Sequence, residues 1–92
     1  MKIFCSELFQ KQLLEYLEKF ANEDLVATKK FKTYLDTIVI NMPTKAKKYK
    51  KSIFFDDENI RDIEHESFRI PFLIDEPSNS YLLLGIYEKS LF

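Results

Sequence analysis

Two hydrophobic runs with few polar side chains lie near the carboxy terminus, residues 68–74 and residues 81–87. Both runs are rich in aromatic and branched side chains, which favour β-strands. The segment between them contains residues that are typical of turns, among them Asp75, Pro77 and Asn79. The pattern predicts two antiparallel strands joined by a short loop, and we expect this hairpin to form the centre of a sheet.

Successive side chains of a strand point to opposite faces, so the alternation assigns each residue to a face. In the first strand, one face carries Phe68, Ile70, Phe72 and Ile74, and the other carries Arg69, Pro71 and Leu73. In the second strand, the same rule separates Leu82, Leu84 and Ile86 from Tyr81, Leu83, Gly85, Tyr87 and then Lys89. We expect one apolar face covered by helices and one mixed face that is a candidate working surface.

Two amphipathic helices are predicted in the first half of the chain. Ser6 followed by Glu7 predicts an N-cap with an acid in the first turn. The first apolar stripe at helical spacing consists of Phe9, Leu13, Tyr16, Leu17 and Phe20. Residues 21–24 predict a break, with Asn22 as the cap of the second helix. The second stripe consists of Phe31, Tyr34, Leu35, Ile38, Val39 and Met42, and Pro43 is expected to end it.

Two short runs complete the predicted sheet. Ile3 and Phe4 predict a strand at an edge or beside the last strand, and residues 59–63 predict a strand before the polar turn 64–67. The order of elements predicts an α+β fold, a two-layer domain whose N-terminal strand and helical hairpin pack on an antiparallel β-sheet. With 92 residues, of which 46% are hydrophobic, the chain is expected to form a single domain, residues 1–92.

Charge is balanced over the chain, with 14 basic and 15 acidic residues, but it is unevenly distributed. A basic segment follows Pro43 and contains Lys45, Lys47, Lys48, Tyr49, Lys50 and Lys51. A lysine run of this kind is most often a solvated loop or a fraying helix. The alternative is contact with nucleic acid, in which the lysines attract phosphate and Tyr49 stacks on a base. The acidic run 56–58 follows closely, and it either screens the lysines or forms a site for a basic partner.

The sequence offers few means of binding metals or forming disulfides. Cys5 is the only cysteine, which excludes an intramolecular disulfide and fits a reducing cytosol. Residues 1–10 contain no long apolar run, so we expect neither a signal peptide nor a membrane span and predict a cytoplasmic protein. One histidine and one cysteine do not make a usual zinc site, and residues 56–58 lack the spacing of a calcium loop.

Residues 59–63, 68–75 and 81–89, preceded by two amphipathic helices, resemble the RelE/ParE superfamily of bacterial toxins. In that family, an aromatic-Arg-aliphatic strand is followed by a short polar loop and a last aliphatic strand that ends in basic or histidine residues. The resemblance covers nearly the whole chain. It implies the toxin of a type II toxin–antitoxin system, held inactive by a cognate antitoxin that wraps over the helices and the sheet.

The resemblance leaves the activity open, because two branches share one fold. RelE-type toxins are ribosome-dependent mRNA interferases, endoribonucleases that inhibit translation, whereas ParE-type toxins poison DNA gyrase by protein binding without cleavage. An inactive interaction domain of the same fold is a further alternative. The implied partners are the antitoxin and mRNA on the ribosome, with no membrane, cofactor or metal; toxin–antitoxin heterodimers can in turn pair into a dimer.

RNA cleavage requires groups that accept the proton of the 2′-hydroxyl, stabilise charge on the phosphate and protonate the leaving oxygen. Arg69 matches the strand arginine of the family, which implies a phosphate clamp, and Arg61 is the candidate second clamp residue. The alternative for Arg69 is an ion pair with Glu88 or Asp62.

The remaining candidate catalytic residues are Tyr87, Lys89 and His65. Tyr87 and Lys89 lie where family members place residues that act on the substrate; the alternative is that Tyr87 covers apolar surface and Lys89 is a solvated strand end. His65 is the only histidine, the side chain that most readily transfers protons near neutrality, and the alternative is an exposed bystander. The chain departs from the RelE branch because Glu88, not a histidine, stands beside Lys89.

Overall fold

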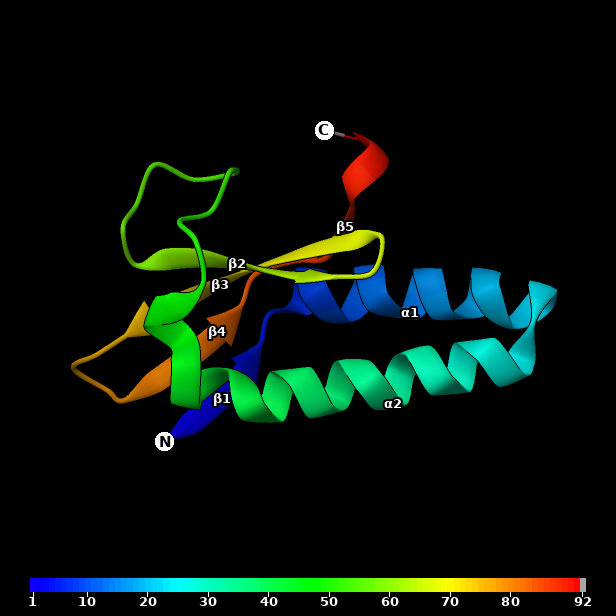
Figure 1. Ribbon diagram of the computed structural model, residues 1–92, viewed down its shortest axis with the longest axis horizontal. Helices are drawn as coiled ribbons and strands as arrows, with labels where there is room; N and C mark the ends of the chain where they lie inside the picture. The colour runs from blue at the N-terminus through cyan, green and yellow to red at the C-terminus, as the bar shows by residue number, and fades with distance from the viewer. Residues whose placement is uncertain (92) are drawn as a thin grey trace.

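The chain folds into two layers, with a helical hairpin packed against one face of a sheet (Figure 1). The computed structural model describes residues 1–91, so the predicted domain end at residue 92 lies outside the described part. In chain order, the elements are β1 (Lys2–Cys5), α1 (Glu7–Glu23), α2 (Leu25–Asn41), the 3-10 helix η1 (Met42–Lys48), β2 (Ile60–His65), β3 (Phe68–Asp75), β4 (Ser80–Leu83), β5 (Tyr87–Glu88) and the 3-10 turn η2 (Lys89–Leu91). The predicted α+β class is confirmed.

The sheet has the order β1-β4-β3-β2, with β5 also paired to β3. The predicted hairpin of β3 and β4 is therefore central, and β1 lies at an edge beside β4, as expected. The predicted antiparallel pairing of β2, β3 and β4 is confirmed. The sheet as a whole is mixed, because β1 runs parallel to β4. Both strands end at the start of α1, where the Ser6 N–H donates to the Leu83 carbonyl at 2.9 Å.

The two helices begin at side-chain caps. Ser6 caps α1 as predicted, accepting the Phe9 N–H at 3.0 Å. The prediction of Asn22 as the cap of α2 is wrong: α1 continues through Glu23, and Asp24 accepts the Ala27 N–H at 3.0 Å. Asp24 has an extended backbone, which breaks the helix at that residue. Within residues 1–91, neither helix is long and apolar enough to cross a membrane.

The core lies between the helical hairpin and the sheet. Its fully buried side chains include Leu35, Met42, Ile63, Ile70, Phe72, Leu83 and Ile86. The first predicted stripe is confirmed, since Phe9 is buried and its other members pack against the core. In the second stripe, Tyr34 is an error: it is 61% exposed, because the neighbouring Leu35 takes the inward position on α2.

A bulge interrupts the strand that was predicted to run from Tyr81 to Tyr87. Phe72 pairs with Leu83, but Arg69 pairs with Tyr87, so β3 is opposed by one extra residue. Pro71 lies opposite the bulge. Its carbonyl accepts the Leu84 N–H at 2.8 Å, but proline has no N–H with which to donate the second hydrogen bond of the pair. The Leu84 carbonyl instead accepts the Ser6 hydroxyl at 3.0 Å.

The bulge corrects the assignment of faces in the last strand. Because Tyr81 pairs with Ile74 and Leu83 pairs with Phe72, both share the helix-covered face. Leu82 pairs with Leu73 and lies on the opposite face. After the extra residue, the alternation of side chains between the two faces is shifted by one position. Tyr87 therefore shares the face of Arg69, which the helices leave uncovered.

We predict that Ser6→Ala destabilises the fold more than Asp24→Ala. Both substitutions remove a helix N-cap, which contributes about 1 kcal/mol, but only Ser6→Ala also leaves the Leu84 carbonyl without its partner, a further cost of about 1–2 kcal/mol. Urea unfolding measures both variants. Equal losses of unfolding free energy would contradict the role of Ser6 at the bulge.

Candidate functional site

Arg69 lies at the middle of the uncovered face of the sheet. It is placed by β3, with Glu64 of β2 directly opposite on one side and Tyr87 of β5 on the other. Its guanidinium is 2.9 Å from the Glu64 carboxylate and 3.6 Å from that of Asp62. The Arg69 side chain is 24% exposed, so solvent reaches it.

Lys89 completes this cluster from η2. Its Nζ lies 3.4 Å from the second carboxylate oxygen of Glu64. The structure therefore brings together three of the predicted site residues, Arg69, Tyr87 and Lys89, as their positions in the sequence suggested. We call these three residues, with Asp62 and Glu64, the arginine cluster.

The charges of the arginine cluster balance one another. Arg69 and then Lys89 hold the pKa of the Glu64 carboxyl below its usual value, because both favour its ionised form. Asp62 is only 4% exposed; its Oδ2 accepts the Ile53 N–H at 3.0 Å, and its Oδ1 has no hydrogen-bond partner. The expected ion pair between Arg69 and Asp62 is thus present, whereas the main partner is Glu64 and not Glu88.

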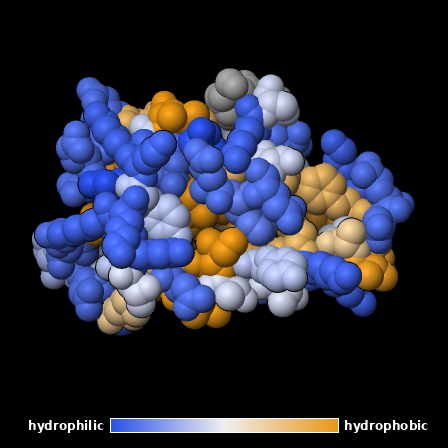
Figure 2. Space-filling view, viewed as in Figure 1, coloured by the Kyte–Doolittle hydropathy of each residue, from blue (hydrophilic) through white to orange (hydrophobic). Residues whose placement is uncertain are grey.

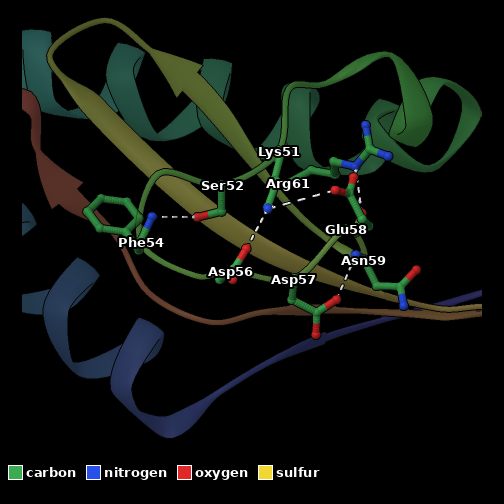
Figure 3. A network of polar contacts seen from close by, with 8 residues as sticks. All are labelled: Lys51, Ser52, Phe54, Asp56, Asp57, Glu58, Asn59 and Arg61. Atoms are coloured by element: carbon green, nitrogen blue, oxygen red, sulfur yellow. Dashed lines mark hydrogen bonds and ion pairs between the residues drawn. The ribbon is translucent and has the colours of Figure 1, made fainter.

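The loop between η1 and β2 borders the arginine cluster and is held by its own polar contacts (Figure 3). Lys51 reaches Asp56 at 2.7 Å and Glu58 at 3.7 Å, and the Phe54 N–H donates to the Ser52 hydroxyl. The Phe54 ring lies 4.9 Å from that of Tyr87, measured between centroids. The acidic run 56–58 therefore partly neutralises the basic segment, one of the two roles expected for it.

Arg61 does not share a clamp with Arg69. It pairs with Phe72 and so lies on the opposite face of the sheet. Its guanidinium donates to the carbonyls of Glu58, Lys47 and Tyr49 at 3.0, 3.3 and 2.8 Å. Arg61 therefore links the middle of the basic segment, Lys47 to Tyr49, to the backbone at Glu58.

His65 also lies away from the arginine cluster. It is the last residue of β2, not part of an exposed turn, and it is 8% exposed. Its ring centroid is 5.3 Å from that of Phe31 on α2, and its Nε2 is buried without a partner. Neither the catalytic interpretation nor the exposed-bystander interpretation fits this position, because His65 packs against the helix layer.

The basic segment is ordered against the sheet and is not a free loop. Most of it forms η1, and the Lys50 carbonyl accepts the Asp62 N–H at 3.0 Å. Lys47 pairs with Glu76 at 2.7 Å, which leaves Lys45, Lys48 and Lys50 without an ion pair within residues 1–91. Of these three lysines, Lys50 lies next to the arginine cluster, because its carbonyl pairs with Asp62. The other two belong to η1, which packs into the core on the helix-covered side.

Tyr49 is less available for base stacking than predicted. Its ring is half-buried and stands edge-on to Phe72, with centroids 5.5 Å apart. Lys45 Nζ lies 5.8 Å from the centroid of the Tyr49 ring. Phe72 and Lys45 therefore already cover part of the Tyr49 ring.

The chain matches no known family model and no curated protein sequence. Within residues 1–91, no group of three or more histidine, cysteine, aspartate or glutamate side chains is placed to hold a metal ion. Any function assigned to this chain must therefore follow from the geometry of its own side chains.

The arginine cluster provides a cation, a base and a hydroxyl on one surface. A guanidinium binds two phosphate oxygens in a fork, a carboxylate accepts protons, and a phenol donates one. Sequence reasoning named Asp62 as a possible partner of Arg69 but missed Glu64 and Phe54 as members or neighbours of the cluster. The register of the β2–β3 hairpin, with its tight turn at Glu66 and Ser67, would have found Glu64 opposite Arg69.

We predict that Arg69→Gln and Lys89→Gln each raise the pKa of the Glu64 carboxyl toward its ordinary value, because each removes a cation that favours the ionised form. An NMR titration of the Glu64 side-chain carboxyl measures the pKa in each variant. Lys32→Gln is the control, since Lys32 pairs with Asp36 on α2. An unchanged pKa in Arg69→Gln would refute the coupling.

Glu64 also makes stability depend on pH. Because its pKa is lowered by folding, its ion pairs contribute fully above the unfolded value of about 4.3 and are lost as the pH falls through the lower folded value. We expect the difference in unfolding free energy between the parent chain and Lys89→Gln to shrink over that acidic range, measured by urea unfolding.

Proposed function

We propose that this chain is the toxin of a type II toxin–antitoxin system and acts as a ribosome-dependent mRNA interferase. The observation that carries the proposal is the arginine cluster: Arg69, Glu64, Tyr87 and Lys89 meet on the face of the sheet that the helices leave uncovered. Exposed Lys50, whose carbonyl pairs with Asp62, adds positive charge next to this face, where it attracts the RNA backbone.

Each chemical role has a candidate in the arginine cluster. Arg69 exchanges the Glu64 carboxylate for the scissile phosphate and stabilises its developing charge. Glu64, released from Arg69, accepts the proton of the 2′-hydroxyl as its oxygen bonds to phosphorus. Tyr87 or Lys89 donates a proton to the 5′-oxygen as its bond to phosphorus breaks. The products are a 2′,3′-cyclic phosphate and a 5′-hydroxyl end.

The exposed sides of the helices suit a covering antitoxin. Val26, Tyr34 and Ile40 of α2 and Leu14 of α1 are each more than half exposed, at 66%, 61%, 67% and 57%. Apolar side chains in such numbers on a small domain favour burial by a partner. The cognate antitoxin is the partner that the proposed function requires.

A second candidate, a ParE-type toxin that acts on DNA gyrase by protein binding, is favoured by the charge balance of the cluster. Arg69 and Lys89 face two carboxylates, Asp62 and Glu64, so their formal charges cancel. A neutral, ion-paired surface suits contact with protein better than contact with a polyanion. The third alternative, an inactive interaction domain of the same fold, differs from both toxins because it would cause no growth arrest.

We predict that induction of the chain in a bacterial host generates new transcript 5′ ends within translated codons, and that Arg69→Lys reduces them about 100-fold. Lysine keeps the charge that pairs with Glu64 and Asp62, but it lacks the fork that holds a phosphate in the transition state. Arg61→Lys is the matched control on the opposite face and should retain cleavage.

The outcomes separate the candidates. Growth arrest without new 5′ ends would refute the interferase and support the gyrase-directed toxin. Absence of arrest, with folded protein present in the cell, would refute both toxins. Full cleavage by a folded Arg69→Lys variant would show that Arg69 is not the phosphate clamp.

A further inference from the structure

A cavity of about 440 Å³ lies at the end of the helical hairpin, where α1 joins α2. The α1–α2 connection forms one wall, and the β2–β3 turn with Glu88 of β5 forms the other. We call it the acidic pocket, and its lining includes Phe20, Phe31, Phe68, Glu23, Glu66 and Glu88. Apolar atoms are exposed at this end of the molecule among hydrophilic ones, at the right of Figure 2.

The floor of the acidic pocket is an aromatic cluster. The ring centroids of Phe20, Phe31 and Phe68 lie 5.4 to 6.1 Å from one another. Phe31 and Phe68 also belong to the core, which holds the floor rigid. Beside the pocket, Leu25 and Val26 at the start of α2 are 53% and 66% exposed, so the apolar surface extends beyond the cavity.

The rim of the pocket is negative and largely uncompensated. It carries four carboxylates, Glu23, Asp24, Glu66 and Glu88, against the single ammonium of Lys19, a formal charge of −3. Within residues 1–91, Glu23, Glu66 and Glu88 have no ion-pair partner.

Several acidic residues elsewhere are neutralised locally: Asp36, Asp56, Glu64 and Glu76 each hold a lysine or arginine of the same chain. The acidic pocket differs from these sites because its unpaired carboxylates surround an apolar floor. Its charge repels phosphate, so it does not extend the RNA-binding surface.

We propose that the acidic pocket is a docking site for a basic segment of a partner protein. Arginine and lysine carry an apolar stem and a cationic head, which match an apolar floor with an acidic rim. An arginine can also stack on the aromatic rings of the floor. A neighbouring apolar residue of the same segment would cover Leu25 and Val26. This inference does not depend on the proposed function.

The test uses the full ¹⁵N-labelled chain and a capped peptide of sequence Gly-Arg-Leu-Arg-Gly. We expect amide shifts confined to the α1–α2 connection and the β2–β3 turn. The combined substitutions Glu23→Gln, Glu66→Gln and Glu88→Gln should weaken binding roughly tenfold, because each exposed ion pair contributes up to a few-fold. Glu15→Gln with Glu18→Gln, on the exposed side of α1, is the matched control and should bind normally.

Three results would overturn the proposal. One is the absence of shifts at millimolar peptide. Another is a set of shifts centred on the acidic run 56–58, which would assign the contact to nonspecific charge. The third is equal binding by the chain with the three glutamines, whose amide spectrum also reports whether it is folded. A peptide with glutamate in place of both arginines should not bind.

Discussion

Pro71 imposes the constraint on which the arrangement of the sheet depends. A proline in a central strand removes one N–H from the hydrogen-bond ladder of the sheet. Opposite Pro71, the neighbouring strand contains an extra residue within Leu84 to Ile86. The polar groups freed there are satisfied by α1: Ser6 donates to the Leu84 carbonyl, and Gln12 accepts the Ile86 N–H at 2.9 Å. The helix layer and the sheet are thus joined through the defect.

The same bulge determines which residues meet on the uncovered face. Without the extra residue, Tyr87 would continue the phase of Leu83 and point toward the helices. With it, Tyr87 lies beside Arg69 and contacts Phe54 of the loop. The close approach of the Tyr87 ring to Gly85 leaves no room for a Cβ at that residue, 2.8 Å away. The composition of the candidate site therefore follows from a backbone irregularity.

Much of the fold could be predicted from the sequence, because its signals are local. The stripe of α1, the Ser6 cap and the central hairpin follow from spacing and residue type. The face of Tyr81 and Leu83, the parallel direction of β1 and the burial of His65 could not be predicted in this way. Each depends on a contact that residue spacing does not encode: the bulge opposite Pro71, the pairing of β1 with β4, and the packing of His65 on α2. Strict alternation along the last strand, which takes no account of the bulge, places Tyr81 and Tyr87 on the same face as Arg69. This is correct for Tyr87 and wrong for Tyr81, which faces the helices.

The parallel pairing of β1 with β4 has a consequence for synthesis of the chain. Lys2 to Cys5 lie beside Ser80 to Leu83, so the first strand has no place in the sheet until nearly all the residues have been made. The Ser6–Leu84 contact spans 78 positions in sequence. Such long-range closure is slow, and it requires that β4 has already left the ribosome. A nascent chain that ends before β4 therefore lacks the completed surface.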